Sequence, residues 1–269
     1  MVALWKAVTA FGKVASRQSG EGGTQLQIRV INPNTTAAMT AGIERAARDA
    51  ASPGTIIEAV TSSTGPVSIE GYYDEAMSLP GLLQAIATGE AAGAGAHIIA
   101  CFDDTGLDAA RQCAVAPVIG IGQAAMIAAS LVAARFTIVT TLARSVPALE
   151  FNVLKYGFER QARVRASNVA VLDLETPGGD AHGRIDAEIV RAKAEDRAEA
   201  IILGCAGMAQ LAADLSRRHG LPVIDGVGAA VKLSEMLGTL GLRTSKIGAF
   251  ETGAPKLLTG PLAQLMGRS

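Results

Sequence analysis

The sequence predicts an α/β protein that consists of two homologous lobes, each with a parallel β-sheet. Short apolar runs alternate with longer Ala-rich stretches, which is typical of parallel sheets whose strands are joined by helices. The short runs are apolar almost throughout, so helices should cover both faces of each sheet. Segments of the first half also recur in the second half, which indicates a duplicated unit.

Strands are expected where the apolar runs are rich in β-branched residues. These runs cover residues 28–31, 56–60, 97–100, 118–119, 137–140, 168–172, 200–203, 223–224 and 246–249. Helices are expected in the stretches between them, among them residues 36–51, 73–91 and 185–197. The order of elements follows from the switch between short apolar runs and longer helical patterns.

The recurring segments form matched pairs that are separated by about 105 positions. The pairs are HIIACFDDTG (97–106) with AIILGCAGMA (200–209), PVIGIGQAAM (117–126) with PVIDGVGAAV (222–231), and VINPNTT (30–36) with IVTTLAR (138–144). Three pairs of segments with nearly the same separation are difficult to explain by chance. We therefore infer two homologous lobes with a boundary in the region 125–136.

The chain divides on this basis into an N-terminal extension and two lobes. Residues 1–25 lack the long apolar region and the cleavage site of a secretory signal, so we expect a short accessory extension that is a candidate for disorder. Lobe 1 is expected at residues 26–128 and lobe 2 at 129–245. Residues 246–262 are a candidate for packing back onto lobe 1.

The composition indicates a protein that binds a small molecule. About half of the 269 residues are hydrophobic and the formal net charge is −1, so no basic field is available for nucleic acid. No apolar run reaches the length of a membrane span. Three cysteines without disulfide or metal-ligand spacing indicate a reducing cytoplasm and no metal. The sequence also contains no phosphate-binding glycine loop, so we expect no cofactor.

Two of the cysteines occupy matched positions in the repeat. Cys101 and Cys205 each follow an apolar strand and precede a Gly-containing turn that should open a helix. Ligands bind at this end of parallel strands, and a helix N-terminus there should lower the pKa of a thiol. One thiolate could remove an α-proton from one face of a substrate while the opposite thiol returns a proton to the other face. This arrangement predicts a racemase or epimerase.

A structural explanation also exists for each cysteine. A lone cysteine in an apolar run is usually a small core residue. The matched placement of Cys101 and Cys205 favours catalysis over this explanation. Cys113 has no partner in the repeat, and we expect it to be structural.

At these residues the chain resembles the aspartate/glutamate racemase superfamily, and within it the hydantoin and allantoin racemase branch. The resemblance runs from about residue 27 to residue 258. It is carried by VINPNTT (30–36), TSSTGPVSIEG (61–71), ACFDDTGLDAAR (100–111), PVIGIGQAA (117–125) and LGCAGMA (203–209). The resemblance implies two flavodoxin-like lobes, an active-site cleft between them, no cofactor and a homo-oligomer.

The resemblance also implies roles for individual residues. Cys101 and Cys205 match the two acid/base cysteines. The contact positions comprise turn residues whose backbone N–H groups cradle the substrate, polar residues at strand ends, and glycines on loops that approach the cleft. They are Asn34, Gly65, Phe102, Asp103, Gly122, Thr140, Thr141, Ala206 and Gly207. Asn34 could instead form a turn or cap a helix, and the two threonines could cap the next helix.

The charges near the cysteines favour a neutral substrate. The turns after both cysteines lack Lys and Arg, whereas Asp103 and Asp104 follow Cys101. These carboxylates would repel an anionic substrate and raise the pKa of the thiol. An aspartate could accept a ring N–H, or it could be a helix N-cap. Arg111 and Arg144 are the cations that could still reach the cleft.

The function that these observations predict is racemisation of 5-substituted hydantoins. The alternatives within the superfamily are allantoin racemase and an aspartate/glutamate-type amino-acid racemase. A decarboxylase or a cis–trans isomerase fits less well, because such decarboxylases resemble a one-cysteine arrangement. The non-enzymatic alternative is a two-lobe small-molecule binding protein, which has no need for a thiol at both strand ends.

Overall fold

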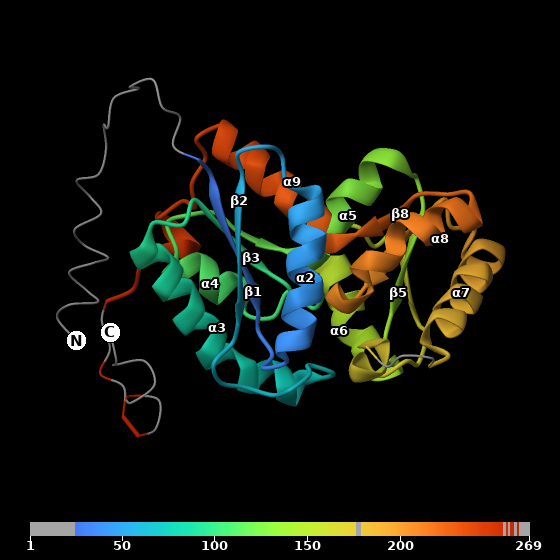
Figure 1. Cartoon of the computed structure of the whole chain (residues 1–269), viewed down its shortest axis with the longest axis horizontal. Coiled ribbons are helices and arrows are strands. Elements are labelled where there is room, and N and C mark those ends of the chain that lie inside the picture. The colour runs from blue at the N-terminus through green and yellow to red at the C-terminus, as the bar shows by residue number, and fades with distance from the viewer. Residues whose placement is uncertain (1–24, 176–178, 255–256, 258, 261–262, 264–269) are drawn as a thin grey trace.

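The computed structural model describes residues 25–175, 179–254, 257, 259–260 and 263. Its strands form two four-stranded parallel sheets that lie side by side (Figure 1). The strands are β1 (Gln27–Asn32), β2 (Ile56–Thr61), β3 (Ala96–Ile99), β4 (Val118–Gly120), β5 (Phe136–Thr140), β6 (Ala162–Ala166), β7 (Ala200–Gly204) and β8 (Val223–Asp225). The first four strands form the sheet of lobe 1 and the last four form the sheet of lobe 2.

Helices connect these strands, as the alternating pattern predicts. The α-helices are α2 (Ala37–Ala50), α3 (Tyr72–Ala92), α4 (Leu107–Cys113), α5 (Ile121–Val132), α6 (Val146–Lys155), α7 (Ala181–Arg191), α8 (Ala212–His219) and α9 (Gly226–Thr239). The short helical segments are η2 (Ala143–Ser145), η3 (Val171–Glu175), the π-helical η4 (Ala192–Asp196), η5 (Ala206–Leu211) and η6 (Gly248–Phe250).

The two sheets have the same topology. Their strand orders are β2-β1-β3-β4 and β6-β5-β7-β8, so each strand of lobe 1 has a counterpart four strands later. Central strand residues such as Val30, Ile98 and Ile202 are fully buried. The predicted α/β architecture with two pseudo-symmetric lobes is therefore confirmed, and the continuous apolar runs reflect sheets covered on both faces.

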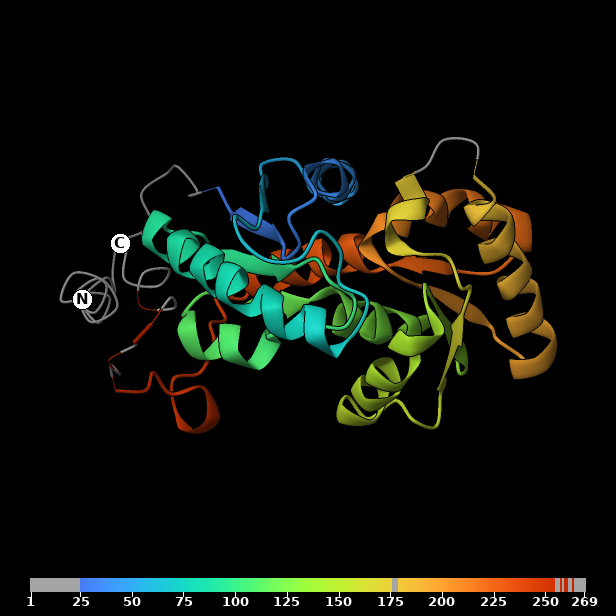
Figure 2. The ribbon, with the colours of Figure 1, turned by 90° about the horizontal axis from the view of Figure 1, so that it is seen from below.

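Two helices cross between the lobes and join them. Helix α5 follows β4 of lobe 1 but also packs against β7 and β8, and α9 follows β8 but packs against β3 and β4 (Figures 1 and 2). The two helices also pack against each other. One apolar cluster consequently contains Ile98 of lobe 1, Ile202 of lobe 2 and Met126 of α5. The predicted boundary at residues 128/129 lies within α5, and the lobe boundaries stay a prediction.

Two expected strands are wrong. The run at 168–172 lies in a loop and in η3, and the outer strand β6 is formed by residues 162–166 instead. An edge strand with one solvent-facing side alternates polar and apolar residues, which hides it from a search for apolar runs. The apolar side chains of Val169 and Val171 are buried outside the sheet. The run at 246–249 forms part of η6 and its surroundings, with Ile247 exposed at the surface.

The ends of the chain are described only in part. Apart from residue 25, the expected N-terminal extension lies outside the described residues, as do several positions after residue 254. Thr244 hydrogen-bonds the carbonyls of Val115 and Ala116, and Lys246 hydrogen-bonds the carbonyl of Arg111. The described part of the C-terminal segment thus lies along lobe 1. In the described ranges, no helix is long and apolar enough to cross a membrane.

Candidate active site

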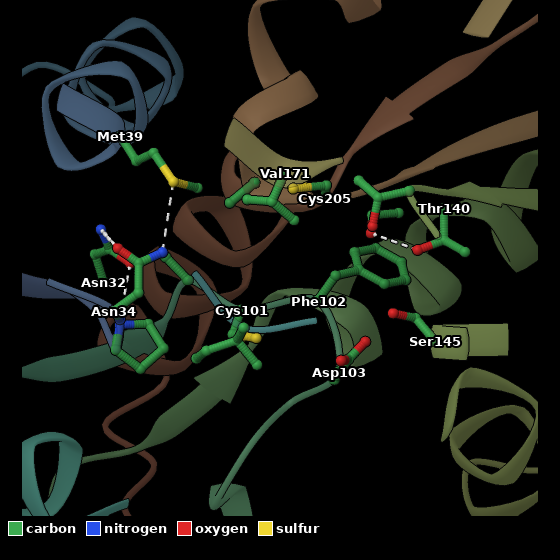
Figure 3. Close-up of a pocket in the computed structure, with 16 residues that line it drawn as sticks. Asn32, Asn34, Met39, Cys101, Phe102, Asp103, Thr140, Ser145, Val171 and Cys205 are labelled. Atoms are coloured by element: carbon green, nitrogen blue, oxygen red, sulfur yellow. Dashed lines mark hydrogen bonds between the residues drawn. The ribbon is translucent and has the colours of Figure 1, made fainter. Parts of the chain in front are cut away.

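A pocket lies between the lobes at the carboxyl ends of the central strands (Figure 3). Its cavity volume is about 40 Å³. The lining residues are Asn32, Pro33, Asn34, Met39, Ile69, Ala100, Cys101, Phe102, Asp103, Thr140, Thr141, Ser145, Val171, Gly204, Cys205 and Ala206. Because β1, β3, β5 and β7 all end here, the topology alone brings both cysteine turns to one site.

Most of the predicted site residues lie in this pocket. Those that line it are Asn34, Cys101, Phe102, Asp103, Thr140, Thr141, Cys205 and Ala206. Three predicted glycines are not among the lining residues. Gly65 has a φ of +133° and lies near Pro33 and Ser78, Gly122 lies at the start of α5, and Gly207 lies beside Cys205 and Leu174. The contact roles of all these residues stay predictions.

Several lining residues were not predicted from the sequence. The repeat contains a signal for Asn32, because it ends β1 as Thr140 ends β5. Ile69 and Val171 belong to long connections after strands, and no local pattern marks them. Their presence in the pocket depends on how the loops of the two lobes meet.

The turns after the two cysteines differ. Cys205 is the N-cap of η5, and its carbonyl accepts a hydrogen bond from the N–H of Met208 at 3.0 Å. Cys101 instead begins a turn that extends to Gly106 before α4 starts. The expected Gly-containing turn that opens a helix is therefore present after Cys101, where it leads through Gly106 into α4, whereas η5 begins directly after Cys205.

The Cys101 thiol has a pKa well above its ordinary value. Burial is the main cause, and the neighbouring Asp103 carboxylate and Cys205 raise the pKa further. The Thr105 hydroxyl, 3.5 Å from Cys101 Sγ, and the N–H of Asp103 oppose this rise only in part. The expected lowering of this thiol's pKa is therefore wrong, and these surroundings favour the thiol form of Cys101 over the thiolate.

The two aspartates after Cys101 have different surroundings. Asp103 lines the pocket, and burial together with Glu75 and Asp104 raises its pKa to about 7. Asp104 is buried away from the pocket, where its carboxylate accepts hydrogen bonds from the N–H groups of Gly122 and Gln123. It therefore caps the N-terminus of α5, whereas the N-cap of α4 is Gly106.

Asn34 forms the turn that the sequence offered as one alternative, and its contact with a substrate stays a prediction. Its Oδ1 accepts hydrogen bonds from the Thr36 N–H at 2.9 Å and from Asn32 Nδ2 at 2.9 Å, which stabilises the turn before α2. Its Nδ2 lies 3.5 Å from the sulfur of Met39, on the pocket side (Figure 3). The side-chain amide is thus held as a hydrogen-bond donor facing the pocket.

Thr140 and Thr141 are buried at the end of β5 and do not cap the next helix. The N-cap residues of η2 and α6 are Leu142 and Ser145, and neither makes a side-chain cap hydrogen bond. The Thr140 hydroxyl donates to the carbonyl of Gly204 at 3.2 Å, which ties β5 to β7 beside Cys205. The capping alternative is therefore wrong for these two threonines.

The pocket lining that the structure describes contains one acidic side chain, that of Asp103, and no Lys, Arg or His. Arg111 donates instead to the Val118 carbonyl and to Gln123. Arg144 forms an ion pair with Glu70. The described residues also hold no group of three or more His, Cys, Asp or Glu side chains that could bind a metal ion. The chemistry available in the pocket is that of two thiols, one carboxyl group and neutral donors.

Glu70 connects the lobes at the edge of the pocket. Its carboxylate pairs with Arg144 and accepts a hydrogen bond from the Val171 N–H at 3.0 Å. Ile69 and Val171, which line the pocket, are thereby held close to each other. The loop after β2 and the start of η3 thus form one wall from two lobes.

Comparison with known proteins identifies the family of this chain. A model of the Asp/Glu/Hydantoin racemase family matches residues 28–234. The hydantoin racemase of Pseudomonas sp. (strain NS671) is 46% identical over 88% of this chain and 96% of that protein. The hydantoin racemase of Rhizobium meliloti is 50% identical over 84% of this chain and 94% of that protein.

Solved structures share the fold. The allantoin racemase from Klebsiella pneumoniae has a TM-score of 0.87 and 46% sequence identity, covering 89% of this chain and 98% of that one. A glutamate racemase from Francisella tularensis has a TM-score of 0.60 at 16% identity over 83% of this chain and 85% of its own, a likeness of fold alone. With two cysteines at equivalent strand ends of two matching lobes, the chain belongs to the Asp/Glu/Hydantoin racemase family.

Proposed function

We propose that this protein racemises 5-substituted hydantoins without a cofactor, and that Cys101 and Cys205 are the two acid/base groups. The observation that carries the proposal is the position of two thiols in one pocket whose described lining has no cationic side chain. An anionic amino acid would meet the Asp103 carboxylate there without a compensating charge. A neutral ring would avoid this repulsion.

The reaction needs one thiolate and one thiol. The ring carbon that bears the substituent lies beside a carbonyl group, so removal of its proton by a thiolate leaves an enolate and a neutral thiol. The opposite thiol then gives its proton to the other face of that carbon and becomes the thiolate. Because the pKa of Cys101 is raised, we expect Cys101 to be the protonated partner in the resting enzyme.

The pocket also offers groups that could orient the ring. The Asn34 amide could donate to a ring carbonyl, and the N–H groups of the Ala206–Gly207 turn could stabilise the enolate oxygen. Asp103, when ionised, could accept a ring N–H. The ring could also contact Phe102, Thr140 and Thr141, which line the same pocket.

The direct test is the optical rotation of a single-enantiomer 5-alkylhydantoin, followed against an enzyme-free blank. We expect rotation to decay to zero at a rate proportional to enzyme concentration. Rotation that decays no faster than the blank at high enzyme concentration would refute the proposal. Exchange of the ring C–H in D₂O, followed by NMR, separates a racemase from a binding protein, since a binder gives no exchange above the blank.

Allantoin is the second candidate substrate, because a structure named allantoin racemase matches this chain at 46% identity. Allantoin has the hydantoin ring with a ureido substituent, so the same two thiols could act on it. A panel of 5-alkylhydantoins and allantoin, compared by kcat/KM, distinguishes the two.

We also propose that the protein is a cytoplasmic homo-oligomer. The resemblance to the family supports an oligomer, and free cysteines without disulfide spacing support a reducing compartment. Light scattering coupled to size exclusion tests the first statement, and a monomer would refute it. Cell fractionation tests the second.

A further inference from the structure

The turn that carries Cys101 is held by groups outside the turn, some of them in the other lobe. Its residue Asp104 has a φ of 52°, in the left-handed region that residues with a side chain adopt rarely. The turn is closed internally by the Asp104 N–H, which donates to the Cys101 carbonyl at 3.0 Å. The Thr105 hydroxyl and the Leu107 N–H make further contacts within the turn. These local contacts do not fix the orientation of the turn relative to the pocket, so contacts with other elements must orient it.

The Asp104 carboxylate provides the first set of these contacts. It accepts hydrogen bonds from the N–H groups of Gly122 at 2.9 Å and Gln123 at 2.8 Å, at the N-terminus of α5. A Cβ on Gly120 would lie 2.1 Å from Asp104 Oδ1, and a Cβ on Gly122 would lie 2.3 Å from the Phe102 carbonyl oxygen. The two glycines are thus required for the close approach of α5 to the turn.

Helix α6 of lobe 2 provides the second set of contacts. Asn152 Nδ2 donates to the Asp103 carbonyl at 2.7 Å, and the Tyr156 hydroxyl donates to Asp104 Oδ2 at 2.8 Å. The two residues are one helical turn apart and so project from the same face of the helix. Neither belongs to the described lining of the pocket. Their effect on the reaction must therefore act through the turn.

We infer that Asn152 and Tyr156 of lobe 2 are positioning residues for Cys101 of lobe 1, and that they keep its half-buried thiol shielded from further water and directed at the substrate. The inference rests on the proposed function, in which Cys101 is an acid/base group. Cys205 is positioned by other elements. The helical segment η5 begins directly after it and packs against α2 and α9. Loss of the α6 contacts should therefore affect one cysteine and leave the other unchanged.

The raised pKa of Cys101 determines the direction of the expected effect. Burial is its main cause, so a looser turn that admits water should lower the pKa of Cys101 toward its ordinary value. More thiolate at pH 8 means faster alkylation of Cys101. At the same time the thiol is misplaced relative to the substrate, and small misplacements of a catalytic group cost up to about 100-fold in rate. Alkylation should rise while turnover falls.

The test uses Asn152→Leu, Tyr156→Phe and the double variant, which remove the donors and nearly keep the side-chain volumes. Iodoacetamide alkylation at pH 8 is followed by mass spectrometry of the tryptic peptides, which separate the three cysteines. We expect the Cys101:Cys205 rate ratio to rise at least threefold in the double variant. We expect kcat for a 5-alkylhydantoin to fall about tenfold with KM changed less than twofold.

The matched control is Leu154→Ala, an exposed position on the same helix, which should change neither readout. Faster alkylation of both cysteines, or an unchanged ratio together with unchanged kcat, would overturn the inference. If Asn152→Leu fails to fold, Tyr156→Phe alone, verified by circular dichroism, gives the same ratio test. The alkylation readout needs no turnover. A wild type that does not racemise would refute the proposed function, whereas the alkylation ratio would still show whether Asn152 and Tyr156 control the Cys101 thiol.

Discussion

The two cysteines follow equivalent strands, yet their surroundings differ in almost every other respect. Cys205 stands at the N-cap of a helical segment whose next residues are uncharged. Cys101 begins a longer turn with a half-buried aspartate, Asp103, and a buried one, Asp104, and this turn is held by α5 and by α6 of the opposite lobe. Duplication therefore preserved the place of the thiol, while each lobe acquired a separate means of controlling it. A two-base racemase can use this difference, because its two bases must be in opposite protonation states.

The largest expected effect is the loss of either thiol. We predict that Cys101→Ser and Cys205→Ser each reduce racemisation by roughly 100- to 10,000-fold, the contribution typical of a positioned acid or base. Each variant should still exchange the ring proton of one enantiomer in D₂O, and the two variants should act on opposite enantiomers. Cys113→Ser is the matched control. Racemisation at the wild-type rate in either active-site variant would contradict the two-base mechanism.

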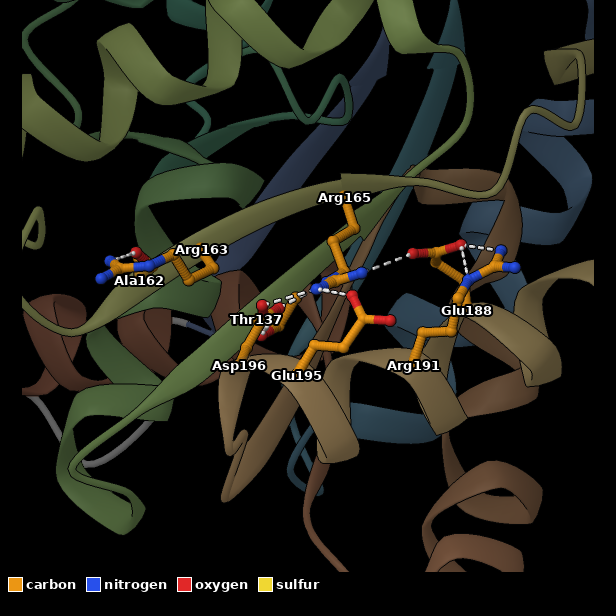
Figure 4. A network of polar contacts seen from close by, with 8 residues as sticks. All are labelled: Thr137, Ala162, Arg163, Arg165, Glu188, Arg191, Glu195 and Asp196. Carbon is orange, nitrogen blue, oxygen red and sulfur yellow. Dashed lines mark hydrogen bonds and ion pairs between the residues drawn. The ribbon is translucent and has the colours of Figure 1, made fainter.

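The lobes also differ in how an arginine of the sheet is paired. In lobe 2, Arg165 of β6 contacts Asp196 and Glu195 at 2.7 Å each and also pairs with the buried Glu188 (Figure 4). In lobe 1, Arg29 pairs with Glu58, whose side chain is 38% exposed. Removal of Arg165 leaves the carboxylates of Glu188, Glu195 and Asp196 close together without a cation, and Glu188 is buried. Removal of Arg29 leaves the Glu58 carboxylate, which water can solvate.

We therefore predict that Arg165→Ala lowers the free energy of unfolding by about 2 kcal/mol and Arg29→Ala by about 1 kcal/mol. The pKa of Asp196 is lowered by the hydrogen bond from Arg165, so its stabilisation is present above its ordinary pKa and is lost as pH falls through the lowered value. Urea unfolding at pH 7 and at pH 3 measures both effects. Equal reductions in the free energy of unfolding for Arg165→Ala and Arg29→Ala at pH 7 would contradict this difference between the lobes.

Glycines next to the two cysteine turns give a sharper comparison. A Cβ at Gly122 would lie 2.3 Å from a backbone oxygen, whereas a Cβ at Gly207 would meet the end of the Leu174 side chain at 3.1 Å and Cys205 Sγ at 3.8 Å. We predict that Gly122→Ala costs about 1.5 kcal/mol of stability, because the backbone must move. Gly207→Ala should cost less than about 0.5 kcal/mol, because a flexible side chain can move instead. Thermal unfolding of both variants tests this, and a larger loss for Gly207→Ala would contradict the geometry.

The smallest expected effect concerns the charge beside Cys101. The Asp103 carboxylate is the second largest cause of the raised pKa of this thiol. Asp103→Asn should therefore lower the pKa of Cys101 and speed its alkylation at pH 8 by about threefold, since a few tenths of a kcal/mol already change a thiolate fraction measurably. The wild-type rate should continue to rise as pH increases beyond 9. Unchanged Cys101 alkylation in Asp103→Asn would show that burial alone controls the thiol.

Much of the fold and the centre of the site could be predicted from the sequence. Apolar runs and Ala-rich stretches predicted most strands correctly, because buried parallel strands and helices have local patterns. The repeat then placed Cys101 and Cys205 at equivalent strand ends. The edge strand β6 escapes prediction because its alternating pattern is weak. The apolar run at 168–172 predicts a strand, but its valines are buried outside the sheet.

The sequence by itself determined the two-lobed α/β architecture and the pair of thiols, because periodicity and internal repetition are properties of neighbouring residues and of the duplicated chain. Only the tertiary structure decided the protonation of Cys101, the crossing of α5 and α9, and the wall formed by Ile69 and Val171. The pKa of a thiol depends on its burial and on charges nearby in space. The partners of Asp104 come from positions 18 to 52 residues away. No local sequence pattern specifies contacts between residues so far apart in the chain. These contacts are determined by the packing of the lobes.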